Sequence, residues 1–213
     1  MVTLYLDWDG TIVDVRTRHY RVYADMLAYL GQEPLSPTLY WTRMRRGASA
    51  LGLTSTLQET DRAMFHREWL ARIESPQYLS LDALIPGAKP SLAALAERHD
   101  LVLVTLRRDR AALTQQISSL GLIDLFSAIY CHSGLDDSQS KADLIRIATP
   151  DVNRRSIVVG DSEADVQSAR EVFLASVCVT TGVRNRRYLT ALQPDHLIPA
   201  VSHLGGLLQS LGL

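Results

Sequence analysis

The sequence predicts an α/β protein whose three-layer core has a parallel sheet, with an all-helical unit inserted near the N-terminus. From about residue 91 onward, short apolar strand-like runs alternate with helical patterns, an order that builds a parallel sheet covered on both faces. Residues 15–83 instead carry Arg, Tyr, Trp and Leu at helical spacing, with no convincing strand. We therefore expect a core from residues 1–14 and 86–213 and a helical unit from residues 15–85.

The first elements follow from local patterns. VTLYL (2–6) predicts a buried strand, and RTRHYRVYADMLAYL (16–30) and DRAMFHREWLARI (61–73) predict helices of the insertion. We expect Asp14 to be the N-cap of the first helix and Gly31 and Pro34 to end it. LIPGAKPSL (84–92), with its prolines and glycine, predicts the turn that returns the chain to the core.

The remaining elements alternate. Strands are predicted at 101–105, 127–132, 156–160 and 176–181, and a weak one at 196–198. Helices are predicted at 91–99, 108–120, 141–148, 163–173, near 186–192 and at 202–211. Asp136 and Asp137 lie between predicted elements and are expected to be ordinary loop acids.

Composition limits the possible functions. The chain has 213 residues, 46% hydrophobic and 21% charged, with a formal net charge of −1, which is typical of a soluble globular protein without a nucleic-acid partner. No run of about 18 apolar residues predicts a membrane span, and the N-terminus lacks the basic region of a signal peptide. Cys131 and Cys178 are expected to be reduced and buried, which favours the cytoplasm.

Polar residues follow three predicted strands at the points where they end. Asp7 and Asp9 follow the first strand, Thr105 ends the 101–105 strand, and Asp161 and Asp165 follow the 156–160 strand. In open parallel sheets ligands bind at the carboxyl ends of the strands. Buried carboxylates are costly unless they are paired or bind a metal. The pattern predicts a Mg²⁺ site, with Asp7 and Asp161 as the first ligands to expect.

Further polar residues suit a phosphate. Alternate side chains of an extended strand point the same way, so both N-terminal aspartates can face one site. Gly10 permits a tight turn after them, and Thr11 can bond to backbone or phosphate there. Of the two lysines, Lys89 lies in the return turn, whereas Lys141 begins a helix just after a predicted strand. Lys141 is therefore the better candidate for a phosphoryl oxygen.

These residues resemble a known set. DWDGT, Thr105, Lys141 and GDSEAD resemble the four motifs of the haloacid dehalogenase (HAD) superfamily, in family order, over nearly the whole chain. The helical insertion resembles the C1 cap of the phosphoglycolate phosphatase and β-phosphoglucomutase-like branch. The resemblance implies a Rossmann-like, HAD-like core with an all-helical cap domain. It also implies Mg²⁺-dependent hydrolysis of a small phosphorylated metabolite, by a monomer or weak homodimer, with phosphoglycolate as a substrate by analogy alone.

The resemblance also implies roles. Asp7 is similar to the nucleophile that becomes an aspartyl phosphate, and Asp9 to the general acid that later activates water and offers its backbone carbonyl to the metal. Thr105 and Lys141 would hold the phosphoryl oxygens. The implied metal site comprises Asp7, Asp9, Asp161 and Asp165, the last of which could instead orient Lys141.

Other features bear on substrate contacts. Arg43, Arg45, Arg46 and Gly47 resemble the cap segment that leans over the site, where they would suit an anionic substrate. Three departures from the family stand out: LRRDR after Thr105, Ala142 where the branch often has Pro, and the bulky Trp8, interpreted as core packing.

Several functions remain open. A phosphosugar mutase of the same fold would need a cap that admits its substrate in two orientations. A dehalogenase is disfavoured because such relatives lack the second acid, present here as Asp9. A phosphonate-cleaving relative would need a cap lysine, which residues 15–85 lack. A phospho-accepting signalling module would carry its aspartate on a mid-chain strand, where Thr105 stands here. A non-catalytic binding protein is the last alternative.

Overall fold

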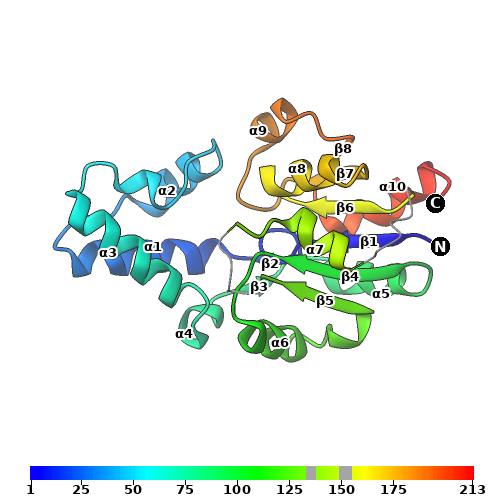
Figure 1. The fold of residues 1–213 in the computed structure, drawn as a ribbon, viewed down its shortest axis with the longest axis horizontal. Helices are drawn as coiled ribbons and strands as arrows, with labels where there is room; N and C mark the ends of the chain where they lie inside the picture. The colour runs from blue at the N-terminus through cyan, green and yellow to red at the C-terminus, as the bar shows by residue number, and fades with distance from the viewer. Residues whose placement is uncertain (133–137, 149–154) are drawn as a thin grey trace.

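The computed structural model describes residues 1–132, 138–148 and 155–213 and shows an α/β core joined to a group of helices (Figure 1). Asp136 and Asp137 lie outside the described residues. The core sheet has the order β5-β4-β1-β6-β7-β8, and every neighbouring pair in it is parallel. The predicted α/β class with a parallel sheet is confirmed. The six strands are β1 (Thr3–Leu6), β4 (Asp100–Thr105), β5 (Ala128–Cys131), β6 (Ile157–Gly160), β7 (Ala175–Val179) and β8 (His196–Ile198).

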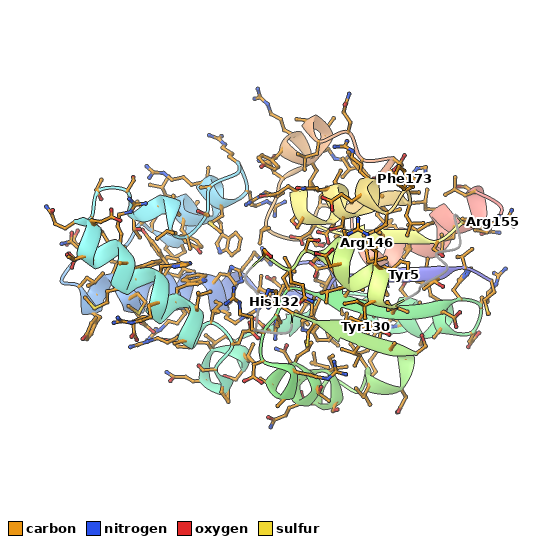
Figure 2. All side chains as sticks on the ribbon, in the orientation of Figure 1. Tyr5, Tyr130, His132, Arg146, Arg155 and Phe173 are labelled. Carbon is orange, nitrogen blue, oxygen red and sulfur yellow. The ribbon has the colours of Figure 1, made fainter. Side chains whose placement is uncertain are left out.

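Both faces of the sheet are covered because alternate strand residues point to opposite sides. Leu4 and Leu6 of β1 pack in one cluster with α5 (Ala88–Ala96), α6 (Arg110–Ser119) and α10 (Leu204–Ser210). Tyr5, labelled in Figure 2, points the other way and packs with α7 (Lys141–Ala148) and α8 (Glu163–Glu171). Leu189 of α9 (Arg186–Ala191) forms a smaller cluster with residues of β7 and α8. The sheet is thus the middle of three layers.

The helices of the insertion, here called the helical unit, are α1 (Arg16–Tyr29), α2 (Pro37–Met44), α3 (Glu59–Arg72) and α4 (Pro76–Leu79), with the short turn η1 (Gly52–Thr54). They have a hydrophobic core of their own, separate from the sheet clusters. Its centre is aromatic: the rings of Tyr23 and Tyr40 lie 4.7 Å apart, and Phe65 packs edge-on against Tyr23. The helical unit is therefore packed around a hydrophobic cluster of its own.

Two linkers join the helical unit to the core as a short antiparallel pair, β2 (Val13–Asp14) with β3 (Ala83–Leu84). This pair was not expected from the sequence. It corrects the expectation for Asp14, because Val15 occupies the N-cap position of α1. Asp14 instead accepts the backbone N–H of Arg16 at 2.9 Å from within β2. The helix ends at Tyr29, before Gly31, as predicted.

Other boundaries differ slightly from the sequence patterns. Helix α5 begins at Ala88, so Pro90 lies inside its first turn, where a missing N–H leaves no helical bond unmade. A short 3₁₀ turn, η3 (Val201–His203), precedes α10, and another, η2 (Ile123–Leu125), follows α6. Trp8 is fully buried, as its interpretation as core packing predicted, and its Nε1 donates to Gln116 at 2.9 Å.

The remaining expectations concern the burial of the two cysteines and the lack of a membrane span. Cys178 is buried, whereas Cys131 is only half-buried, and both thiols are free. Within the described residues, every helix is too short or too polar to cross a bilayer.

Candidate active site

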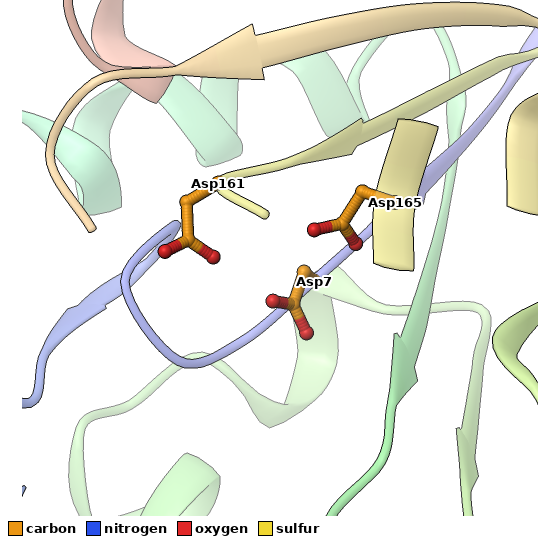
Figure 3. A group of neighbouring side chains, drawn as sticks. All are labelled: Asp7, Asp161 and Asp165. Atoms are coloured by element: carbon orange, nitrogen blue, oxygen red, sulfur yellow. The ribbon is translucent and has the colours of Figure 1, made fainter. Parts of the chain in front are cut away.

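Three aspartates meet at the carboxyl edge of the sheet. Asp7 follows β1, Asp161 follows β6, and Asp165 lies in the first turn of α8. One carboxylate oxygen from each lies within 4.8 Å of the other two (Figure 3). All three residues are buried, with 7% or less of their surface exposed. The topology produces this meeting, because β1 and β6 are neighbours in the sheet and end at the same edge.

Glycines, Gly160 and Gly10 among them, leave the space that these carboxylates occupy. A Cβ on Gly160 would lie 1.9 Å from Cγ of Asp165. Gly10 has a φ of +78°, which favours glycine, and a Cβ there would lie 2.5 Å from Oδ2 of Asp161. A larger residue at either position would displace an acid.

Lys141 links two of the acids from the first turn of α7. Its Nζ lies 2.7 Å from Oδ1 of Asp7 and 2.6 Å from Oδ1 of Asp165. Burial disfavours its charged form, but the carboxylates of Asp165 and Asp7 raise the pKa of Lys141 above its usual value. The lysine therefore remains an ammonium at the centre of the cluster. Asp165 also accepts bonds from the backbone N–H (3.0 Å) and hydroxyl (2.7 Å) of Ser162.

The acids retain an excess of negative charge that fits a divalent cation. Burial raises the pKa of Asp7 to about 7 despite the opposing effect of Lys141. Burial, followed by the charges of Asp7 and Asp165, also raises the pKa of Asp161 well above its usual value. Three carboxylates face one ammonium, and all the donors are oxygens, the set that Mg²⁺ prefers. The residues thus fit the metal that the sequence predicted.

Asp9 lies beside this cluster and is held by two arginines. Arg107, two residues beyond Thr105, donates to both of its oxygens, with Nε at 3.1 Å from Oδ2. Nη2 of Arg18, on α1, lies 2.8 Å from Oδ1. Burial alone would raise the pKa of Asp9, but the charges of Arg107 and Arg18 hold it far below its usual value. Asp9 is therefore a carboxylate in this arrangement.

A second acid completes a buried network around the same arginines. Asp82, whose side chain is fully buried, accepts Nε of Arg18 at 2.9 Å and Nη2 of Arg107 at 3.2 Å. Gln116 on α6 accepts Nη1 of Arg107 at 2.9 Å and donates to Asp82 at the same distance. Two carboxylates thus balance two guanidiniums across the boundary between the helical unit and the core.

Thr105 and Thr11 are both buried near the acids. Oγ1 of Thr105 accepts the backbone N–H of Arg107 at 3.4 Å. Oγ1 of Thr11 has no hydrogen-bond partner among residues 1–132, 138–148 and 155–213. Thr105 lines the cavity described next, whereas the fully buried Thr11 is not among the residues that line it, so contact of Thr11 with phosphate remains a prediction.

A cavity of about 260 Å³ opens onto these residues. From the core it is lined by Asp7, Asp9, Thr105, Arg107, Lys141 and Asp161, among others, and from the helical unit by Arg18, His19, Ile73 and Glu74. Burial, followed by the charge of Arg18, lowers the pKa of His19 to about 3, so its ring between Trp41 and Trp69 is neutral. The helical unit therefore forms one wall of the cavity.

The structure brings the aspartates, Thr105 and Lys141 together but places the predicted cap residues elsewhere. Arg43, Arg46 and Gly47 are exposed and do not line this cavity. Arg45 donates through Nη2 to the backbone carbonyl of Thr180 at 2.8 Å, on the core. Contact of these arginines with substrate remains a prediction.

Sequence reasoning missed the roles of Arg18, Asp82, Arg107 and Gln116. The available signals were a charged residue on the inward face of α1 for Arg18, an acid at the end of the insertion for Asp82 and the unusual LRRDR segment for Arg107, whereas Gln116 had none. None of them states which residues pair.

The fold and this site define an enzyme whose carboxylate-rich centre is covered by a helical insertion. Residues 1–172 match the family model of the haloacid dehalogenase-like hydrolases. The chain belongs to this family, as the motif resemblance indicated.

Known relatives agree with this assignment. The chain is 25% identical over 188 residues to a phosphoglycolate phosphatase of Rhodobacter capsulatus, covering 85% of each chain. It is 26% identical over 208 residues to a phosphoglycolate phosphatase of Synechococcus elongatus, covering 96% of this chain and 95% of the relative. A haloacid dehalogenase-like hydrolase of Streptococcus pneumoniae superposes with a TM-score of 0.83 at 20% identity, over 97% of this chain and 98% of the other.

Proposed function

We propose that the protein is a Mg²⁺-dependent phosphatase of small phosphate monoesters, with phosphoglycolate as the first substrate to test. The observation that carries this proposal is the position of Asp7, whose carboxylate faces the cavity between Lys141 and Asp161. The names of the curated relatives suggest phosphoglycolate. The free thiols suit a reducing compartment such as the cytoplasm.

In this proposal Asp7 is the nucleophile. An oxygen of its carboxylate forms a bond to phosphorus while the bond from phosphorus to the ester oxygen breaks, which divides one difficult displacement into two steps. Lys141 and Thr105 donate to the phosphoryl oxygens. Asp7, Asp161 and Asp165 would hold Mg²⁺, which would offset the negative charge of the phosphoryl group. The Asp9 backbone carbonyl is a further ligand in the proposal.

Asp9 performs the proton transfers. Its low pKa keeps it deprotonated, as the second step requires, but the bonds from Arg107 must weaken before it can take a proton from the water that hydrolyses the aspartyl phosphate. Donation of a proton in the first step would require one of its oxygens to leave Arg107 and reach the ester oxygen. Esters whose leaving group needs no proton should therefore react fastest in the first step.

The helical unit, with boundaries proposed at residues 15 and 85, acts as a cap that keeps bulk water from the reacting groups. Its residues Arg18, His19, Ile73 and Glu74 support this role because they line the cavity opposite the sheet. The cavity of about 260 Å³ suits a small ester.

A panel of phosphate esters with Mg²⁺ or with EDTA tests the proposal. The panel should include phosphoglycolate, p-nitrophenyl phosphate and β-glucose 1-phosphate, the last of which also reveals mutase activity. We expect Mg²⁺-dependent phosphate release by the wild type, none by Asp7→Asn, and unchanged release by the matched control Asp124→Asn, which alters an exposed acid far along the chain from the site. Equal activity of Asp7→Asn and wild type would overturn it.

A further inference from the structure

The helical unit contacts the core at a second place, distant in sequence from both linkers. Residues 44–48, here called the docking segment, begin at the last residue of α2 and lie beside residues 180–188, which form a loop and the first turn of α9 (Figure 1). The backbone N–H of Asn185 donates to the carbonyl of Arg45 at 2.9 Å. A Cβ on Gly47 would lie 2.4 Å from the ring of Tyr188, so the two segments are closely packed.

Arg184 donates two hydrogen bonds across this boundary. Its Nη1 donates to the carbonyl of Met44 at 2.8 Å and to that of Ala48 at 3.1 Å. Met44 is the last residue of α2, where carbonyls lack helical partners and a cation is favourable. Arg184 is 8% exposed, and its guanidinium lies 5.2 Å from the ring centre of Tyr188. The side chain is therefore fixed on several sides.

The same guanidinium also binds Glu163 at the start of α8, close in sequence to Asp161 and Asp165. Nε and Nη2 of Arg184 donate to the two oxygens of Glu163 at 2.7 and 2.6 Å, a paired geometry that fixes direction as well as distance. Glu163 is the first residue of α8, two residues after Asp161. The preceding residue of the loop, Val183, donates its backbone N–H to Oδ2 of Asp161. One arginine therefore joins the docking segment to the start of α8, next to Asp161.

We propose that Arg184 is a positioning residue that latches the helical unit onto the core and couples its position to the loop of Asp161. The proposal rests on the proposed function for its kinetic consequences, since a released helical unit would no longer cover the bound ester. With the latch formed, the helical unit is held by its two linkers, by the ion pairs of Arg18 with Asp9 and of Arg107 with Asp82, and by the docking segment. Movement of the docking segment away from the core therefore requires the bonds of Arg184 to break.

Hydrogen exchange and kinetics of Arg184→Met test the latch, because methionine keeps an unbranched side chain but has no donors. We expect amide exchange in residues 44–48 and 180–188 to become at least ten-fold faster, while β1 and β4 exchange as in the wild type. The KM for a small ester should rise about ten-fold with a smaller fall in kcat. Arg187→Met, which alters an exposed arginine in the first turn of α9, is the matched control and should match the wild type.

Unchanged exchange in the docking segment of Arg184→Met would overturn the latch. If that variant exchanges faster throughout the sheet, Arg184→Lys decides. Lysine keeps the charge but cannot make all the bonds, so faster exchange confined to the two segments supports the latch, and wild-type exchange overturns it. The exchange measurement needs no substrate. An inactive wild type would therefore refute the proposed phosphatase alone, and an active wild type with an unaltered docking segment in Arg184→Met would refute the latch alone.

Discussion

The buried network around Asp9 predicts strong energetic coupling between Arg107 and Asp82. Both side chains are almost completely buried, at 3% and 0% exposure. Replacing one partner leaves an uncompensated charge in the interior, which typically costs about 3–5 kcal/mol of unfolding free energy. Because Arg18 still contacts both acids when Arg107 is removed, we expect the lower end, about 3 kcal/mol, for Arg107→Gln and a similar loss for Asp82→Asn.

The double variant separates pairing from packing. If the two losses were independent, it would lose about 6 kcal/mol. It instead retains one acid, Asp9, against one arginine, Arg18, so the charges balance again. We expect a total loss of about 3–4 kcal/mol and hence a coupling energy of about 2–3 kcal/mol, within the range found for residues in contact.

Urea unfolding of the metal-free protein measures the four free energies of this cycle. A matched control is the surface pair Arg146 and Asp143, with side chains 50% and 46% exposed and 2.8 Å apart, for which the coupling should stay below about 1 kcal/mol. Additivity of Arg107→Gln and Asp82→Asn within about 0.5 kcal/mol would refute the reasoning. The two groups would then not compensate each other in the folded protein.

Three further predictions concern the metal-free site and one backbone position. Burial raises the pKa of Asp7 from 3.8 to about 7, so between these pH values the folded protein binds a proton that the unfolded protein does not. The stabilisation from this proton is complete below pH 3.8 and is lost as pH rises through 7. In EDTA the melting temperature should therefore rise from pH 8 to pH 6, and should rise less in Asp7→Asn; a flat wild-type profile would contradict this. Gly160→Ala should abolish Mg²⁺-induced thermal stabilisation because its Cβ overlaps Asp165, whereas Gly205→Ala, with nothing within 4 Å, should retain it. Phe173, just after α8, has a φ of 58°, which favours glycine, and an exposed ring (Figure 2). Phe173→Gly should therefore raise the free energy of unfolding, measured in urea, by about 0.5–1 kcal/mol. A lower free energy of unfolding would argue against backbone strain at this position.

The sequence predicted the sheet and the meeting of the acids for one physical reason. Strand periodicity fixes which residues are strand ends, and a parallel sheet places all carboxyl ends at one edge. Asp7 and Asp161 are therefore neighbours as soon as β1 and β6 are adjacent. Local patterns also located the C-terminal end of α1 and the burial of Trp8. In each case the signal lies within a few residues of its consequence.

The arginine contacts could not be predicted in the same way. Arg18, Arg107 and Arg184 belong to segments whose patterns are those of ordinary helices and loops, and their partners lie 64, 98 and 140 residues away. An arginine can reach several acceptors from one backbone position, so composition and spacing leave its partner open. The docking segment shows the result: its arginines suggested substrate contacts, but its backbone carbonyls accept bonds from the core.

The two arginine networks hold the helical unit to the core at two separate places. Arg107 binds Asp9 and Asp82 near the linkers, and Arg184 binds the docking segment and Glu163 beyond the cavity. A hinge movement of the helical unit must therefore change the partners of Asp9 or break the bonds of Arg184, or do both. In the proposed mechanism Asp9 needs a free oxygen to transfer protons. Under that proposal, the position of the helical unit and the proton transfer by Asp9 are linked through shared side chains rather than through a change in the sheet.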